Sequence, residues 1–142
     1  MIVVDTTVWI DFFQGAETPE DLHLQRLITA GRSLALTDLI FFEILQGIRE
    51  DAECERTRRT LLLYPILRME QFATFEHAAR IYRTCRRRGL TVRKTIDCLI
   101  AALCIAEDVE LFHKDADFDA IARVAPLKVH RLPRARNGHY IR

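Results

Sequence analysis

The chain has 142 residues, of which 49% are hydrophobic, and its 21 basic and 20 acidic side chains leave a net charge of +1. This is the size of one domain with a buried core, and the even charge balance by itself indicates no class of partner. The chain shows no apolar run as long as a membrane span, no secretory signal before the first expected strand and no CxxC spacing among its four cysteines, so we expect a reduced, cytoplasmic protein without a membrane segment or a thiolate metal site.

Apolar periodicity alternates between short strands and helices along the whole chain. The expected strands cover residues 2–4, 34–37, 64–69, 109–114 and 127–132. The expected helices begin at about residue 8 and then cover 19–31, 39–49, 51–63, 74–88, 96–108 and 115–125, with Asp38 and Thr95 as N-caps and Gly31 and Gly89 as ends. Such alternation predicts an α/β domain over residues 1–132, with a parallel sheet covered by helices on both faces. A basic tail is expected over residues 133–142.

The first expected strand ends on a carboxylate that is followed at once by two hydroxyls, Asp5, Thr6 and Thr7. One interpretation is a turn, because Asp and Thr accept backbone N–H bonds and start helices well. The other is a ligand site, because open α/β sheets bind ligands at the carboxyl ends of their strands. The local sequence does not decide between the two.

Four further acids fall after a strand or inside a helix that should pack on the sheet. Glu43 lies in the middle of the apolar segment LIFFEILQGIR, where an acid has no capping role. Asp97 opens an apolar helix, where the helix dipole favours it whatever its function and Arg93 one turn earlier could pair with it. Asp115 and Asp117 follow the fourth strand, and one of them should cap the next helix. Because an isolated buried carboxylate costs several kcal/mol, buried acids are expected to be paired or bound to metal.

Acids that converge at one end of a sheet would repel each other unless a divalent cation lay between them. Carboxylate oxygens without His or Cys suit Mg²⁺ or Mn²⁺, and Mg²⁺ commonly binds beside phosphate oxygens. Two segments without acids, Arg80–Lys94 with seven basic residues and Lys128–Arg142 with five, fit a polyanionic partner, although each alone also fits a solvated helix face or a tail. The chemistry predicted is metal-assisted hydrolysis of a phosphodiester. No Ser-His-Asp arrangement or Gly-rich phosphate loop competes with it.

Four segments in this order and spacing carry a resemblance to a known family: IVVDTTVWIDFF, DLIFFEILQGIR, RKTIDCLIAALCIAED and LFHKDADFDAIA. Together they resemble the PIN-domain ribonucleases, and within these the VapC-type toxins of bacterial toxin–antitoxin pairs, from Met1 to about Leu132. The resemblance implies a Rossmann-like, three-layer α/β/α fold with a mainly parallel sheet. It also implies a Mg²⁺-dependent ribonuclease site in which Mn²⁺ can replace Mg²⁺.

The resemblance also implies roles for single residues of this chain. Asp5, Glu43 and Asp97 would be catalytic metal ligands, and the fourth ligand would be Asp115 or Asp117. We favour Asp115 because it directly follows the strand, with Asp117 in support. Thr7 would orient Asp5 or a metal-bound water. The basic residues expected to hold the RNA backbone are Arg86, Arg87, Arg88 and Arg93.

The implied partners are RNA and a VapB-like antitoxin that docks a segment into an apolar groove beside the acids. The aromatics proposed for that groove also suit the core, and they are Trp9, Phe12, Phe13, Phe41 and Phe42. Homodimers are common in this family, but these residues reveal neither the oligomeric state nor which RNA is cut.

Two other functions stay open at this stage. Phosphatases of the haloacid dehalogenase type also place an Asp after their first strand, but they need a second acid two residues later, where this chain has Thr7. A non-catalytic module that binds RNA or a partner on the same fold is the other alternative.

Overall fold

A sheet of five short parallel strands lies at the centre of the fold. The computed structural model describes residues 1–134, so most of the tail predicted over 133–142 lies outside the described residues. The strands are β1 (Ile2–Val4), β2 (Leu34–Thr37), β3 (Ile66–Leu67), β4 (Glu110–Phe112) and β5 (Lys128–Val129). They pair in the order β3-β2-β1-β4-β5, so β1 and β4 are neighbours in the middle of the sheet. All five predicted strands are therefore present, and several are shorter than predicted.

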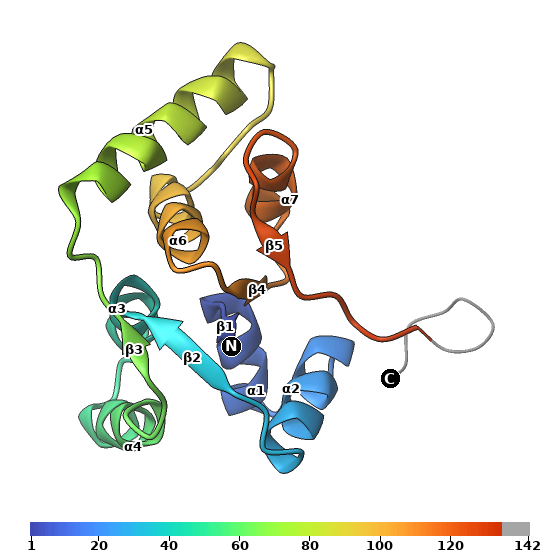
Figure 1. Cartoon of the computed structure of the whole chain (residues 1–142). Coiled ribbons are helices and arrows are strands. Elements are labelled where there is room, and N and C mark those ends of the chain that lie inside the picture. Colours follow the sequence, from blue (N-terminus) through green and yellow to red (C-terminus); the bar gives the residue numbers. More distant parts are fainter. Residues whose placement is uncertain (135–142) are drawn as a thin grey trace.

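Seven helices cover the two faces of this sheet within the described residues. They are α1 (Thr6–Gln14), α2 (Pro19–Thr29), α3 (Asp38–Gln46), α4 (Asp51–Leu61), α5 (Phe72–Arg87), α6 (Thr95–Ala106) and α7 (Ala116–Ala122). Figure 1 shows α5, α6 and α7 together above the central strands and α1 and α2 below them, with α3 and α4 beside β2 and β3. This is the three-layer α/β/α arrangement that the sequence predicts.

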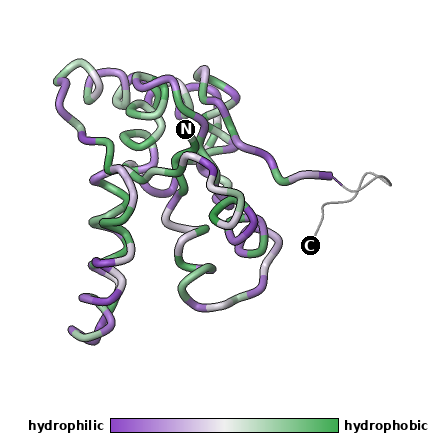
Figure 2. Tube along the Cα trace, turned by 60° about the horizontal axis from the view of Figure 1, so that its bottom comes forward, coloured by the Kyte–Doolittle hydropathy of each residue, from purple (hydrophilic) through white to green (hydrophobic). Residues whose placement is uncertain are grey.

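The core is built from the continuous apolar runs of the strands and from the helix segments that face them. Val3 and Val4 of β1 and Leu111 of β4 are fully buried, as expected for a parallel sheet that is covered on both faces. Trp9 of α1 and Ile100 of α6 are also fully buried. In Figure 2, hydrophobic residues gather where the chain segments meet around β1, and the outer turns are mostly hydrophilic.

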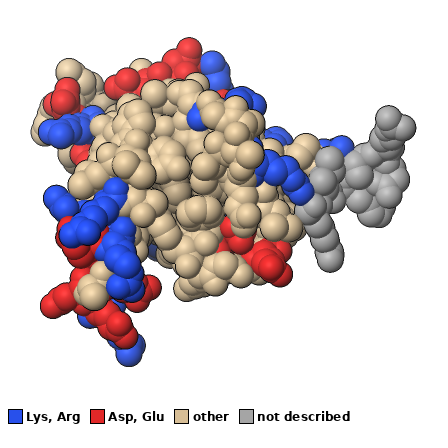
Figure 3. Space-filling model, turned by 90° about the horizontal axis from the view of Figure 1, so that it is seen from below, with Lys and Arg blue, Asp and Glu red and all other residues tan. Residues whose placement is uncertain are grey.

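Charged side chains lie at the margins of the face that Figure 3 presents. That view from below shows a broad uncharged area in the middle, with Lys, Arg, Asp and Glu gathered around it. Within the described residues, no helix combines the length and the apolar character needed to cross a membrane.

Two of the predicted helix caps are wrong. Thr37, not Asp38, caps α3, because its hydroxyl accepts the N–H of Ile40 at 3.0 Å while Asp38 accepts the N–H of Met69 after β3. Thr95 is the first residue of α6, and the preceding Lys94 makes no side-chain cap bond. The backbone N–H of Lys94 instead donates a hydrogen bond to the carboxylate of Asp117 from α7.

The carboxyl ends of the strands bring three chain segments to one edge of the sheet. Val4 of β1 pairs with Phe112 of β4, and the N–H of Asp5 donates to the carbonyl of Phe112 at 2.9 Å. The residues that follow β1, β2 and β4 therefore begin α1, α3 and the loop into α7 at this edge. This edge is where the acids found in the sequence meet.

Candidate functional site

Asp5 both caps a helix and presents a buried oxygen to the site. Its Oδ2 accepts the backbone N–H of Thr7 at 3.2 Å and the hydroxyl of Thr7 at 2.7 Å, which caps α1. Its Oδ1 is buried without a hydrogen-bond partner among the described residues. Burial, with the charge of Glu43, raises the pKa of Asp5 to about 6 against the lowering effect of the Thr7 hydrogen bonds. The two interpretations of Asp5 are thus compatible, because each describes a different oxygen.

Three more carboxylates come together where α6 and α7 begin. Asp97, Asp115 and Asp117 each offer one oxygen, and these oxygens lie within 4.8 Å of one another. Asp97 is 1% exposed, and its Oδ2 has no hydrogen-bond partner within residues 1–134. Burial raises the pKa of Asp97 to about 9, helped by a hydrogen bond with Asp117 and by the charges of Asp5 and Asp115. The charge of Asp5 contributes to the raised pKa of Asp97, so these two carboxylates interact electrostatically.

Asp115 and Asp117, which the sequence leaves as alternatives, have different surroundings. Both oxygens of buried Asp117 accept backbone N–H groups, from Arg93 at 3.0 Å and from Lys94 at 2.9 Å. These bonds hold the pKa of Asp117 below its ordinary value although burial opposes them. Asp115 uses Oδ1 to cap α7, and its side chain keeps 17% exposure. This difference supports Asp115 as the fourth ligand and Asp117 as its support.

Glu43 reaches the cluster from α3. Its Oε1 accepts the hydroxyl of Thr6 at 2.9 Å, so the mid-helix acid has a partner that the sequence did not single out. The charge of Glu43 contributes to the raised pKa of Asp5, and the bond to Thr6 links Glu43 to the residue that follows Asp5. Adjacency to Asp5 was the signal that could have identified Thr6.

The cation beside Asp97 is Lys94 and not Arg93, so the predicted Arg93–Asp97 pair is wrong. The Lys94 ammonium lies 3.1 Å from Asp115 Oδ2 and 3.8 Å from Asp97 Oδ2. Burial opposes the charged form of Lys94, but the carboxylates around it outweigh burial and raise its pKa. Residues three apart on a helix are neighbours, so the i,i+3 spacing could have identified Lys94.

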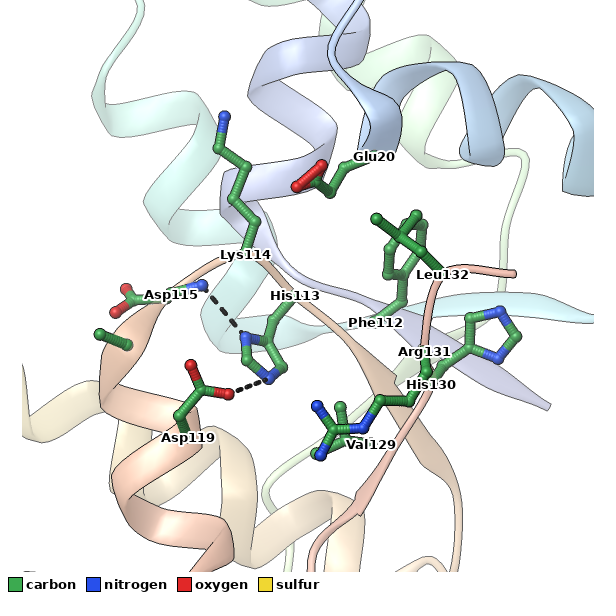
Figure 4. Close-up of a pocket in the computed structure, with 11 residues that line it drawn as sticks. Glu20, Phe112, His113, Lys114, Asp115, Asp119, Val129, His130, Arg131 and Leu132 are labelled. Carbon is green, nitrogen blue, oxygen red and sulfur yellow. Dashed lines mark hydrogen bonds and ion pairs between the residues drawn. The ribbon is translucent and has the colours of Figure 1, made fainter. Parts of the chain in front are cut away.

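The loop between β4 and α7 is held against α1 by short contacts. The hydroxyl of Thr7 accepts the backbone N–H of Lys114 at 3.2 Å, and the Lys114 ammonium lies 2.6 Å from Asp11 of α1. Figure 4 shows the other side of this loop, where His113 Nδ1 accepts the N–H of Asp115 at 3.1 Å and the Asp115 carboxylate points away from the pocket drawn. Thr7 thus ties Asp5 to the segment that carries Asp115.

The donor set fits a divalent cation that prefers oxygen ligands. Asp5 and Asp97 each bury an oxygen without a hydrogen-bond partner in the described part of the chain, and Asp115 adds an accessible carboxylate. Several buried carboxylates at one place are unfavourable unless positive charge compensates them. Carboxylates without a His or Cys ligand suit Mg²⁺ or Mn²⁺.

The arginines proposed for RNA binding do not all lie in this cluster. Arg86 stacks over the ring of Tyr82 at 5.6 Å, and the side chain of Arg87 donates to Thr84, so both contact their own helix α5. Arg86, Arg87 and Arg88 are exposed. The backbone N–H of Arg93, by contrast, is held directly by Asp117. Arg93 is therefore the one of the four that a contact ties to the site.

A groove leads away from the acids between α1, α3 and α4. It has a volume of about 620 Å³, with Thr6, Glu43 and Lys94 at its acidic end. Its apolar lining consists of Ile10, Phe13, Ile44 and Ile48. Of the five aromatics predicted for a groove, only Phe13 lines this one. Trp9 is fully buried in the core, so the prediction for it is wrong.

The raised pKa of Asp97 predicts how stability depends on pH. Near neutral pH the native protein keeps a proton on Asp97 that the unfolded chain, with an ordinary pKa of 3.8, has released. Without metal, stability should therefore fall as the pH rises from about 7 to about 8.5, by up to about 1.4 kcal/mol per pH unit. The variant Asp97→Asn should lack this component. Urea unfolding in the presence of a chelator measures it, and equal pH slopes for the two proteins would contradict the assignment.

Comparisons with known proteins agree with the fold. The family model for the PIN domain matches residues 2–124. The chain is 37% identical over 129 residues to ribonuclease VapC11 of Mycobacterium tuberculosis, covering 90% of this chain and 96% of that protein. It is 32% identical to ribonuclease VapC19 of the same species, over 78% and 86% of the two chains. The solved structure of VapBC2 from Rickettsia felis, bound to a promoter DNA fragment, matches with a TM-score of 0.72 and 16% identity over 92% of this chain and 98% of that one. The chain therefore belongs to the PIN domain family.

Proposed function

We propose that this chain is a Mg²⁺-dependent endoribonuclease of the VapC type, which hydrolyses phosphodiester bonds in RNA. The observation that carries the proposal is the cluster of Asp97, Asp115 and Asp117, whose oxygens lie within 4.8 Å of one another, with the charge of Asp5 acting on Asp97. Asp5 and Asp97 each also bury an oxygen that lacks a hydrogen-bond partner within the described residues. The relatives that match most of the chain are named ribonucleases. The free cysteines agree with the cytoplasmic location expected from the sequence, which stays a prediction.

Each acid has a separate task in this proposal. Asp5, Asp97 and Asp115 hold the divalent ion, and Thr6 fixes one oxygen of Glu43 so that this side chain completes the cluster. Mg²⁺ held there would activate the attacking water and neutralise the charge that develops on the phosphorus. Thr7 keeps Asp5 in place. Arg93 and the exposed arginines at the end of α5 bind the RNA backbone, which contributes affinity without base selectivity.

The test of this function is cleavage of an end-labelled RNA by the purified chain. We expect internal cleavage with Mg²⁺, loss of cleavage with a chelator and recovery when Mn²⁺ is added. Equal cleavage with and without the chelator would reject metal-dependent hydrolysis. Absence of cleavage under every metal condition, with a partner still bound, would instead favour the non-catalytic module. Hydrolysis of a small phosphomonoester would favour the phosphatase, which Thr7 in place of a second acid already disfavours.

We also propose that the groove between α1, α3 and α4 receives a segment of a VapB-like antitoxin. The groove combines its four apolar side chains with polar ones, among them Arg49, Glu50 and Glu53. Because Glu43 and Lys94 lie at its acidic end, an amphipathic segment docked there could bring a charged side chain to the acids. Similar solved structures include VapBC toxin–antitoxin complexes. An antitoxin seated there would block the approach of RNA to Asp5 and Asp97.

A charge placed in the groove should separate partner binding from catalysis. Ile10 lines the groove and is 38% exposed, so Ile10→Arg should leave the fold intact. We expect it to weaken antitoxin binding by about 10-fold or more, because the arginine would replace an apolar contact with the docked segment by a larger, charged side chain. Isothermal titration measures the affinity, and Leu63→Arg, at a residue that is 80% exposed and away from the groove, is the matched control. Equal affinity of both variants would place the antitoxin elsewhere.

A further inference from the structure

Lys94 stands in contact with the same oxygens that the proposed metal site would use. Its ammonium lies 3.1 Å from Asp115 Oδ2 and 3.8 Å from Asp97 Oδ2, and Asp97 Oδ2 is one of the buried oxygens without a hydrogen-bond partner in residues 1–134. The oxygens of Asp97, Asp115 and Asp117 lie within 4.8 Å of one another. A cation ligated by Asp97 and Asp115 would thus meet an ammonium already located between them.

The backbone of Lys94 is fixed, whereas its side chain can move. The N–H groups of Arg93 and Lys94 are both held by Asp117, which anchors the start of α6. The Lys94 side chain is 45% exposed, and it also lines the acidic end of the groove. It can therefore leave the carboxylates toward the groove without any opening of the core.

A divalent ion bound to these oxygens and the Lys94 ammonium at its present distances of 3.1 and 3.8 Å would repel each other. Two positive charges a few ångströms apart repel strongly where solvent screening is incomplete, and Asp97 is almost fully buried. We propose that Lys94 is a built-in competing cation, whose ammonium occupies the position beside Asp115 and Asp97 until a divalent metal ion displaces it toward the groove. This inference rests on the proposed metal site and concerns how that site is loaded.

The chain offers a direct probe because it contains only three lysines, Lys94, Lys114 and Lys128. In protein labelled with ¹³C at the lysine ε-carbon, each lysine contributes one resonance, and Lys94→Met identifies the signal of Lys94. Addition of Mg²⁺ should shift the Lys94 signal. The signal of Lys128, which pairs with exposed Asp108 at 2.6 Å outside the site, should stay in place and serves as the internal reference. An unchanged chemical shift of the Lys94 signal at saturating Mg²⁺ would overturn the proposal.

Metal affinity provides the second measurement. By isothermal titration with Mn²⁺, Lys94→Met should bind the ion about 10-fold more tightly than the original chain, because a like charge within a few ångströms has been removed. Lys94→Arg, which keeps the charge, should bind within about threefold of the original chain, and Lys128→Met is the control for loss of a lysine elsewhere. Unchanged or weaker binding by Lys94→Met, or no Mn²⁺ binding by any of these proteins, would overturn the proposal.

The two measurements do not depend on RNA cleavage. A protein that shows the Lys94 shift and the tighter binding but cuts no RNA would support the competing cation and reject the ribonuclease. A protein that cuts RNA with Mg²⁺ but shows no change in the Lys94 chemical shift would support the ribonuclease and reject the competing cation.

Discussion

Asp5→Asn is expected to lower the rate of RNA cleavage by at least about 100-fold while the protein remains folded. Loss of groups that only support a metal ligand already costs 10–100-fold, and Asp5 is proposed as a ligand itself. Asparagine can still accept the N–H of Thr7, so the cap of α1 is retained. Because burial disfavours the charged form of Asp5, with its pKa raised to about 6, an uncharged side chain should maintain or increase stability.

The measurement is the single-turnover rate on labelled RNA at saturating Mg²⁺, together with the melting temperature of each protein. Asp108→Asn is the matched control, since Asp108 is an exposed acid that pairs with Lys128 outside the site. Cleavage by Asp5→Asn at the rate of the control would remove Asp5 from the catalytic set. A low rate with a much lower melting temperature would assign Asp5 a role in folding instead.

Asp115→Asn and Asp117→Asn are expected to fail in different ways. In Asp117→Asn, an amide NH₂ group replaces one of the two oxygens that accept the backbone N–H groups of Arg93 and Lys94. Two hydrogen-bond donors would then face each other. Loss of a charge-assisted bond at a residue with 3% exposure should cost about 2–4 kcal/mol of unfolding free energy. In Asp115→Asn, the cap of α7 is kept, so stability should change by less than about 1 kcal/mol. Its cleavage rate should nevertheless fall by about 100-fold.

Urea unfolding and cleavage of the same RNA separate the two variants. Asp119→Asn is the control, because Asp119 is an exposed acid in the same helix α7. Full activity of Asp115→Asn together with an inactive but stable Asp117→Asn would reverse the assignment of the fourth ligand.

The fold is largely readable from the periodicity of the sequence. The continuous apolar run of Ile2, Val3 and Val4 predicts a strand in a sheet that is covered on both faces, and all three residues are buried. The apolar helix around Ile100 predicts one of the covering helices, and Ile100 is buried as well. The glycines at the ends of α2 and α5, Gly31 and Gly89, adopt the left-handed conformation that ends a helix there. The caps at Asp38 and Thr95 were predicted wrongly because tertiary partners outweigh local preference.

The site is partly readable for a different reason. Strand ends and an unexplained mid-helix acid indicate which carboxylates converge, because parallel strands place their carboxyl ends at one edge. The contacts that these carboxylates make depend on distances between side chains of different helices, and sequence periodicity does not predict those distances. Lys94 rather than Arg93 faces Asp97, and Thr6 holds Glu43, because of how α6 and α3 are rotated against the sheet.

The central claim is that Asp5, Asp97 and Asp115 surround one divalent ion, and an anomalous difference map from crystals grown with Mn²⁺ tests it most directly. We predict one strong peak at about 2–2.3 Å from oxygens of these three side chains, the usual range for small divalent ions with oxygen ligands, with the Lys94 ammonium moved away. A well-ordered map with no peak among these carboxylates, and with Lys94 still between Asp97 and Asp115, would contradict the account.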